Sequence, residues 1–414
     1  MDKDIIKSTL GEYLIPLNLE KMLQQIQQFK LDMYVKKLNS ITTIKLFIFA
    51  QLMQIKSYTD ISLKLNHTEK LQQELDLESI STSQLSRKFR DVNPTLAQSV
   101  FKDVVQDITH QLGIRKTSEA LGRLNLIDSS TISLCMTQYR WAEFRKTKSG
   151  IKLHLRLVYC DEGSYPDEVV LTPAKPADKT QMDALVVNDP NALNVFDRGY
   201  LDYKAFDVYS DKSIRFVTRL KSNADIHVIE EKSVDPNSTV LREAIVRLGN
   251  KYTYLMKHPL RLIELVDSEG NKVMILTNDF NLSVEEISEV YRKRWQIELF
   301  FKWMKQHLKV KGCYGKSKFA VYNQILIALI TFCLTVLLQL KTKYQGRLLT
   351  IFKFVCLYWD KEFERFHQEL FQIPIRSSAG RRKWNHERIF QETMQQYENG
   401  DIAHLDDLTF DPII

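Results

Sequence analysis

One stretch of the chain gathers polar side chains whose types and spacing could bind a metal beside a phosphate. Residues 291–305 read Tyr-Arg-Lys-Arg-Trp-Gln-Ile-Glu-Leu-Phe-Phe-Lys-Trp-Met-Lys, a pattern that predicts a helix. At about 100° per residue, four side chains fall on one stripe about 60° wide: Tyr291, Arg294, Glu298 and Lys305. A single carboxylate among cations suits a divalent metal bound next to a phosphodiester. The same stripe could instead be a solvated face with i,i+4 ion pairs.

Two aspartates upstream strengthen the interpretation as a metal site. Asp128 follows the apolar run 124–127 and Asp197 follows the run 194–196, and both runs predict buried strands. A carboxylate at the end of a buried strand loses hydration, and two neighbouring carboxylates repel each other unless a cation lies between them. Either aspartate alone could simply cap a turn or a helix. Together with Glu298, they favour a site in which three carboxylates hold metal.

These residues resemble the signature of the DDE transposases of bacterial insertion sequences. The matching positions are Asp128, the string Asp197-Arg-Gly-Tyr200, and the spacing of Tyr291, Arg294, Glu298 and Lys305. That spacing is the one of the group named for its Y-R-E-K signature, the IS-four family. The resemblance covers about residues 120–340, and the long segment before Glu298 is similar to the β-rich insertion of that family.

The resemblance implies an α/β fold, with a ribonuclease-H-like catalytic core that carries an all-β insertion and is flanked by α-helical N- and C-terminal regions. The residue patterns agree with that order of elements. They predict core strands at 124–131, 151–160, 168–172, 194–197 and 214–221, with helices at 179–187 and 203–209. They predict insertion strands at 224–229, 252–254, 260–266 and 272–276. Ser283 and Glu286 predict a capping box at the start of the closing helix. In the ribonuclease-H-like fold the first and fourth strands are neighbours, so we expect Asp128 beside Asp197.

We therefore expect five segments along the chain. They are a helical N-terminal domain for DNA-end binding (1–115), the first part of the core (116–222), the β-rich insertion (223–276), the second part of the core with the glutamate helix (277–340) and a helical C-terminal region (341–414).

Composition excludes several other classes of protein. The 414 residues are 44% hydrophobic and 26% charged, as in a soluble globular protein, and the net charge of +7 is compatible with nucleic acid. The five cysteines are scattered without a C-x-x-C pair, so neither a zinc site nor a disulfide framework is indicated. The N-terminus lacks the apolar core of a signal peptide. Residues 319–340 carry no charge and are long enough for a membrane span, but polar residues interrupt them, so we predict a buried core helix. We expect a cytoplasmic bacterial protein associated with the nucleoid and not with a membrane.

The resemblance also implies a reaction. Asp128, Asp197 and Glu298 would be the catalytic residues and would hold two Mg²⁺ ions, for which Mn²⁺ can substitute. The expected activity is cut-and-paste transposition, in which the ends of an insertion sequence are cleaved and the 3′-hydroxyl ends are transferred to target DNA. The partners would be double-stranded DNA, as inverted-repeat ends and as target, and a second copy of the chain in a homodimer formed on DNA. Two alternatives stay open: a ribonuclease-H-like nuclease without strand transfer, and a catalytically silent DNA-binding relic.

Further side chains are expected to contact DNA. They are Tyr291, Arg294 and Lys305 near the cut, Arg198 beside the second aspartate, Arg145, Lys146 and Lys148 in the basic loop 140–150, and Arg87 and Lys88 in a helix over 81–90. The two cations at 87 and 88 could equally lie on an ordinary solvated face. In the insertion, Tyr252 or Tyr254 could hold a flipped base, although core packing would explain either residue. No heptad or second large apolar stripe predicts a dimer before DNA binds.

Overall fold

The computed structural model describes residues 7–112, 121–145, 148–160, 163–234, 240–266, 270–372 and 386–399. The chain divides into two compact units. The first contains residues 1–104 and 299–413, and the second contains residues 105–298. Two helices, α7 (Pro94–Leu112) and α11 (Trp295–His307), pass from one unit into the other along the chain.

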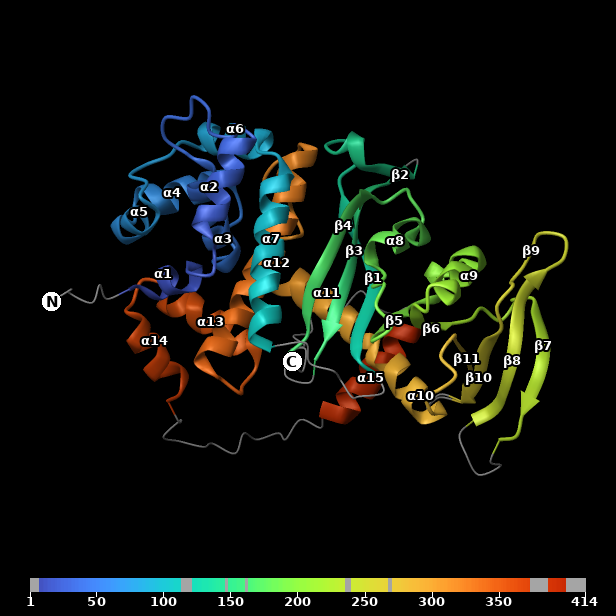
Figure 1. Ribbon diagram of the computed structural model, residues 1–414. Helices are drawn as coiled ribbons and strands as arrows, with labels where there is room; N and C mark the ends of the chain where they lie inside the picture. The colour runs from blue at the N-terminus through green and yellow to red at the C-terminus, as the bar shows by residue number, and fades with distance from the viewer. Residues whose placement is uncertain are drawn as a thin grey trace. The chain divides into compact units, whose positions relative to one another are not determined.

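The first unit is helical, as predicted for the N- and C-terminal regions, and it also contains residues 299–340, which were predicted to belong to the second part of the core. Its helices are α1 (Thr9–Leu14), α2 (Leu19–Gln28), α3 (Ser40–Leu52), α4 (Tyr58–Asn66), α5 (Glu69–Leu75), α6 (Thr82–Asp91), α12 (Lys318–Thr342), α13 (Leu348–Tyr358), α14 (Phe363–Leu370) and α15 (His386–Glu398). The centre is α12, which packs against α3, α6 and α13 (Figure 1). Among the described residues α12 is the one helix long and apolar enough to cross a membrane, and its apolar window is entirely buried in the protein. The prediction of a buried core helix over 319–340 is therefore confirmed.

The polar residues that interrupt α12 are used inside the unit. The Thr335 hydroxyl lies 3.0 Å from the Tyr13 hydroxyl, within hydrogen-bond distance, and the Asn323 amide donates to the Val92 carbonyl (2.8 Å). Buried polar groups with partners of this kind are tolerated in a protein core. They explain why this apolar helix carries Asn and Thr side chains.

The second unit is built on one mixed sheet. Its core strands are β1 (Arg123–Leu134), β2 (Glu143–Arg145), β3 (Lys148–Tyr159), β4 (Tyr165–Pro173), β5 (Ala192–Phe196) and β6 (Arg215–Arg219). The first three long strands are antiparallel, with β3 between β1 and β4, and β5 then pairs in parallel with both β1 and β6. The order β4-β3-β1-β5-β6 is that of the ribonuclease-H-like fold. The predicted fold class is confirmed.

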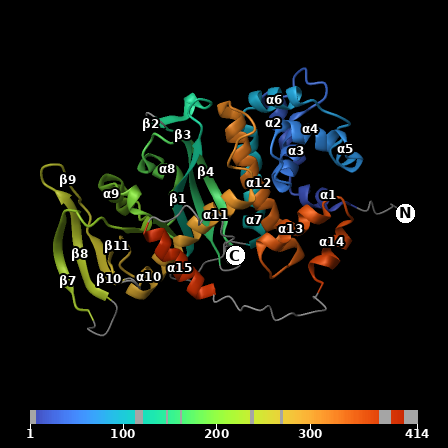
Figure 2. The same cartoon turned by 180° about the vertical axis from the view of Figure 1, so that it is seen from behind.

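The insertion extends this sheet. Its strands are β7 (Ile226–Lys232), β8 (Val240–Asn250), β9 (Tyr254–Leu255), β10 (Leu260–Val266) and β11 (Lys272–Thr277). Strand β11 pairs with β6, so the order continues as β6-β11-β10-β8-β7, and the same sheet is seen from behind in Figure 2. One apolar core, which includes Phe196 and Phe216 as well as Val246 and Leu262, runs under both parts.

Four helix and strand predictions were wrong in detail. The strand predicted for 252–254 is mostly a turn, and β9 begins only at Tyr254. Strand β8 was not predicted; its pairing with β10 is regular from Arg242 to Val246 and shifts register only at the start of the strand. The helix predicted for 179–187 is a 3₁₀ turn (Asp178–Gln181) followed by the short α8 (Met182–Leu185). It ends there because the Asn194 side chain binds both backbone groups of Val187. The helix predicted for 291–305 is interrupted between α10 (Val284–Lys293) and α11.

Candidate active site

Asp128 and Asp197 occupy adjacent positions at the point where one strand ends. The last parallel pair between β1 and β5 is Ile127 with Phe196, and each aspartate directly follows its member of that pair in the chain. Strand β1 continues along β3 to Leu134, and Asp128 therefore lies within β1 rather than at its end. It is β5, not β1, that terminates here. The expected juxtaposition of the two aspartates follows from this register.

Arg294 joins Asp128 to Glu298. Its Nη1 donates to Asp128 Oδ2 (3.3 Å) and its Nη2 donates to Glu298 Oε1 (2.6 Å). The arginine side chain is 14% exposed, and both carboxylates are 18% exposed. A guanidinium presents several donors in a fixed plane, which lets it bridge two carboxylates from one position.

The break between α10 and α11 occurs at Arg294 itself. The Arg294 amide bonds the Tyr291 carbonyl (3.2 Å) and the Ile297 amide bonds the Arg294 carbonyl (3.2 Å), both in the tighter i to i−3 pattern. Such local tightening often marks a functional position in a helix. The Arg294 guanidinium also lies 5.8 Å from the centre of the Tyr291 ring, a cation–π distance.

Electrostatics of the site follow from this crowding. Burial is the largest cause that raises the pKa of the Asp128 carboxyl, to about 7 in all; Arg294 and the Ser129 amide oppose the rise, and Glu298 and Asp197 add to it. Burial would lower the pKa of Arg294, but Glu298, Tyr291, Asp128 and Asp197 together raise it. Burial raises the pKa of the Tyr291 hydroxyl to about 12. The site thus holds more negative charge than one guanidinium neutralises, as expected where a further cation binds.

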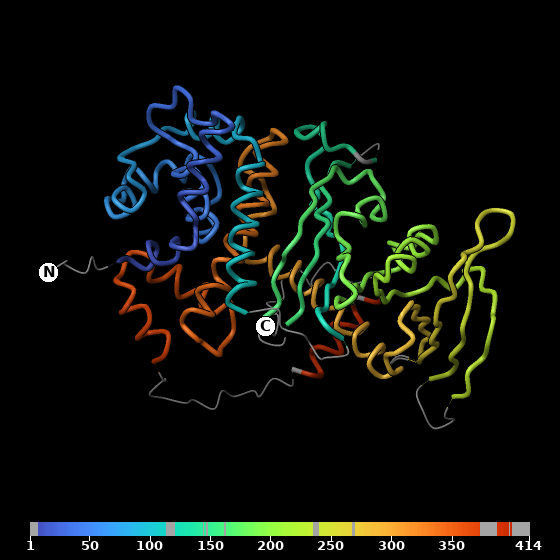
Figure 3. Tube along the Cα trace, in the orientation of Figure 1, coloured from blue at the N-terminus to red at the C-terminus, as the bar shows by residue number. Residues whose placement is uncertain are grey.

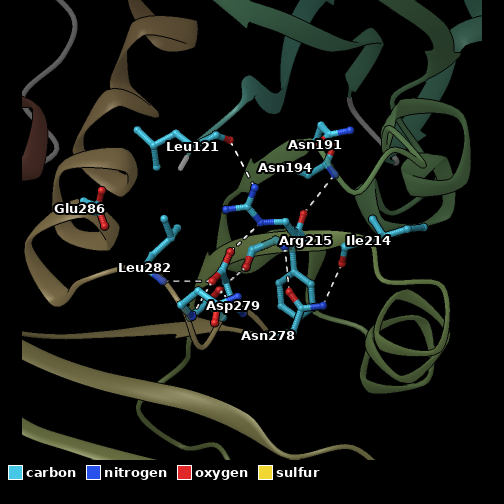
Figure 4. Close-up of polar contacts among 12 residues, drawn as sticks. Leu121, Asn191, Asn194, Ile214, Arg215, Asn278, Asp279, Leu282 and Glu286 are labelled. Carbon is cyan, nitrogen blue, oxygen red and sulfur yellow. Dashed lines mark hydrogen bonds and ion pairs between the residues drawn. The ribbon is translucent and has the colours of Figure 1, made fainter. Parts of the chain in front are cut away.

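The glutamate helix is anchored to the sheet through the turn that precedes α10. Arg215 of β6 donates from Nε to Asp279 Oδ2 (2.6 Å) and from Nη1 to the Leu121 carbonyl (3.5 Å) (Figure 4). The other oxygen of Asp279 accepts the amides of Asn281 (2.9 Å) and Leu282 (3.1 Å). These bonds fix the start of α10, the helix that carries Tyr291 and ends just before Arg294. The predicted capping box of Ser283 and Glu286 is confirmed.

The donor set of the site fits a divalent cation. Carboxylate oxygens are the ligands that Mg²⁺ and Mn²⁺ prefer, and three carboxylates influence one another here. Among the residues that the structure describes, no three His, Cys, Asp or Glu side chains are close enough to ligate one metal ion. Asp128 Oδ2 and Glu298 Oε1 both accept hydrogen bonds from Arg294. Joint ligation of a metal therefore requires the guanidinium to turn away.

A second polar cluster lies beside the site and was not found from the sequence. Asp178 accepts the Ser129 hydroxyl (2.7 Å), pairs with Lys152 (3.0 Å) and lies 3.5 Å from Nδ1 of His154. Ser129 and His154 are cross-strand partners, whereas Asp128 points to the other face of β1. The cluster thus supports the strand next to Asp128. No local sequence signal predicts it, because residues far apart in the chain form it.

His154 makes this cluster sensitive to acid. Its ring is completely buried and lies 3.0 Å from the Thr172 hydroxyl. Burial is the main cause that lowers its pKa, to about 4, and it outweighs the opposing effect of the Asp178 carboxylate. The unfolded chain, with a His pKa near 6.5, therefore takes up the proton first. The contribution of neutral His154 to the free energy of unfolding is fully present above about pH 6.5. It is lost as the pH falls towards 4, by about 3 kcal/mol in all.

We expect His154→Gln to flatten the pH dependence of urea unfolding between pH 6.5 and 4.5. The same substitution at His67, an exposed residue at the end of α4, is the control. A wild-type slope that survives in the His154 variant would contradict the assignment.

The remaining predicted DNA contacts lie at several places. Arg198 is exposed directly after Asp197. Arg145 and Lys148 are exposed on the β2–β3 hairpin, and Lys146 lies outside the described residues. Lys305 is on α11, and its environment belongs to the first unit.

In each of two further pairs of candidates, one residue is exposed and the other has a structural partner. On α6, Arg87 is exposed, whereas Lys88 pairs with Asp32 (2.5 Å) and is mostly covered. In the insertion, Tyr252 is 98% exposed at the turn between β8 and β9, whereas Tyr254 donates its hydroxyl proton to Asp207 (2.6 Å). Tyr254 therefore has a structural partner, and Tyr252 does not pack in the core.

Comparisons with known proteins agree with this geometry. Residues 119–334 match the family model described as a transposase DDE domain. A putative transposase, y4zB, of Sinorhizobium fredii is 30% identical over 286 residues, which are 67% of this chain and 78% of that protein. A probable transposase for insertion sequence element IS5377 of Geobacillus stearothermophilus is 29% identical over 64% of this chain and 68% of its own length. A putative transposase for insertion sequence element IS4SA of Synechocystis is 25% identical over 63% of this chain and 71% of its own length. Membership of the Y-R-E-K group stays a prediction. The matched domain contains Asp128, Asp197 and Glu298. The chain belongs to the DDE transposases, a family of enzymes that act on DNA.

Proposed function

We propose that this transposase cleaves DNA at the ends of an insertion sequence and transfers the 3′-hydroxyl ends to target DNA in an Mg²⁺-dependent reaction. The observation that carries the proposal is the meeting of Asp128, Asp197 and Glu298 around Arg294. The family generally uses divalent metal ions, and the carboxylate donors of this chain fit them.

Each residue then has a defined task. Asp128, Asp197 and Glu298 would hold two Mg²⁺ ions. When bound, these ions would activate a water or a 3′-hydroxyl and stabilise the leaving oxygen. Arg294, once drawn from the carboxylates to a phosphate, neutralises charge beside the scissile bond. Tyr291, whose ring centre lies 5.8 Å from the guanidinium, would fix a phosphate or stack a sugar beside it.

Other cations would hold the duplex. Lys305 on α11 and Arg198 next to Asp197 would bind phosphates near the cut, and Arg145 and Lys148 on the β2–β3 hairpin would bind further along. Joining two element ends in one event needs two active sites, so we propose a homodimer assembled on end DNA. The protein would act in the bacterial cytoplasm, at the nucleoid.

Strand transfer separates this function from its alternatives. The substrates are duplexes that contain the inverted repeats flanking the gene, either uncut or pre-cut to expose the 3′-hydroxyl, with a supercoiled plasmid as target. We expect Mg²⁺-dependent cleavage of the first and joining of the second to plasmid, with both ends joined in one complex. Cleavage without joining would identify a nuclease, and binding without either reaction would identify a silent relic.

A further inference from the structure

The loop between α2 and α3 exposes apolar and basic side chains together. We call residues 29–37 the aromatic–lysine loop. Tyr34 is 90% exposed, Met33 is 56% exposed and Phe29 is about as exposed as Met33. The lysines at 30, 36 and 37 are exposed as well. Large exposed apolar groups that gather in one short segment mark an interaction surface more often than scattered ones do.

The loop is held in a defined conformation. Asp32 accepts the Ser40 amide (2.8 Å) and hydroxyl (2.7 Å) and pairs with Lys88 of α6 (2.5 Å). Lys30 and Tyr34 both have positive φ values, 51° and 64°, in the left-handed region that residues with side chains seldom adopt. Strained backbone persists where the surrounding structure enforces it, and it gathers at functional sites. Here it directs an unpacked tyrosine into solvent.

The aromatic–lysine loop adjoins the predicted recognition helix. The Lys88–Asp32 pair joins it to α6, and Lys37 donates to the Ser79 hydroxyl (2.7 Å) just before that helix. In Figure 3 the trace between α2 and α3 runs beside α6. Arg87, one residue before Lys88, is exposed on α6. Lys88 therefore fixes the loop, whereas Arg87 is exposed on the same helix.

The positive charge of the aromatic–lysine loop favours DNA over other partners. A second copy of the chain would bring lysines against lysines, and a purely apolar partner would strip water from several ammonium groups. Duplex DNA offers phosphates for the lysines and, in its grooves, flat apolar base surfaces for the rings. Proteins that bind the minor groove insert apolar side chains between base steps in this way.

We propose that the aromatic–lysine loop is a DNA-binding element of the helical unit, with Lys30 and Lys36 on phosphates and Tyr34 against bases of the element end. The inference rests on the proposed function and deepens it. It adds a contact surface outside the helix over 81–90, and it assigns Lys88 to holding that surface rather than to touching DNA.

The test measures DNA binding of the full chain by fluorescence anisotropy, without divalent metal, so that cleavage does not interfere. The probe is a duplex with the inverted repeat that flanks the gene. We expect Tyr34→Ser to weaken binding about tenfold, by loss of stacking. The matched control is Leu63→Ser, which removes an exposed apolar side chain from α4.

The lysines are tested through salt dependence. We expect the double variant Lys30→Gln with Lys36→Gln to make the plot of log affinity against log salt shallower by about two units. The control is Lys56→Gln with Lys64→Gln, two exposed lysines that bracket the start and end of α4 and give the same change in net charge. Thermal unfolding of each variant checks that the fold is kept.

The outcomes are distinct. Weaker binding and a shallower slope in the loop variants alone would support the inference. Normal binding by those variants, in a protein that binds and cleaves end DNA, would overturn the inference and leave the proposed function standing. A wild-type chain that does not bind the end duplex would overturn both.

Discussion

Asp128→Asn, Asp197→Asn and Glu298→Gln are each expected to reduce Mg²⁺-dependent cleavage of end DNA by about 10³-fold or more. That loss corresponds to about 4 kcal/mol of transition-state stabilisation, the range of an electrostatic contribution from a bound metal. End binding stays largely intact, because it depends on many dispersed phosphate contacts. Single-turnover cleavage and anisotropy on the same duplex measure the two effects separately.

The amide substitutions suit this test because they keep the shape of the side chain and one of its two acceptor oxygens. The oxygen that accepts from Arg294 is retained in the Asp128 and Glu298 variants, so the arrangement around the guanidinium persists. Glu289→Gln on α10 is the matched control, since Glu289 is an exposed carboxylate paired only with neighbouring Lys293 in the described ion pairs. Near-normal cleavage by any one of the three variants would remove that residue from the site.

Arg294→Ala is expected to reduce cleavage by about ten- to a hundredfold while Mn²⁺ binding persists or tightens. The guanidinium and a divalent cation compete for Asp128 and Glu298, so removing the guanidinium favours the metal in the free protein. Cleavage suffers because the phosphate loses a charge-assisted partner. Electron paramagnetic resonance of Mn²⁺ measures metal binding without relying on activity.

Two variants sharpen that measurement. Arg294→Lys keeps the positive charge but not the planar fork, and we expect it to recover only part of the cleavage rate. Arg292→Ala, which removes an exposed guanidinium from α10, is the matched control. Loss of Mn²⁺ binding together with cleavage in Arg294→Ala would show that Arg294 holds the metal site together instead of competing for it.

Residue patterns were sufficient to predict the order of the core elements, since the strand and helix patterns over 124–221 follow the order of the ribonuclease-H-like fold that the family resemblance implies. Two apolar runs that each end in aspartate, and a polar stripe of helical period, predict the three carboxylates that we propose as metal ligands. Such patterns are local, since the alternation of a strand and the period of a helix are properties of consecutive residues. The burial of α12 was predicted on the same ground, from the polar side chains that interrupt an otherwise apolar run.

Only the tertiary structure decided how these parts are joined. The bridge from Arg294 to Asp128, the anchor of Arg215 on Asp279 and the cluster of Asp178, Ser129 and His154 all join residues that are distant in sequence. The aromatic–lysine loop belongs to the same class. Its composition is visible in the sequence, but its exposure and its ion pair with Lys88 are not. Burial and long-range pairing depend on which surfaces meet after folding, and a linear pattern does not record that.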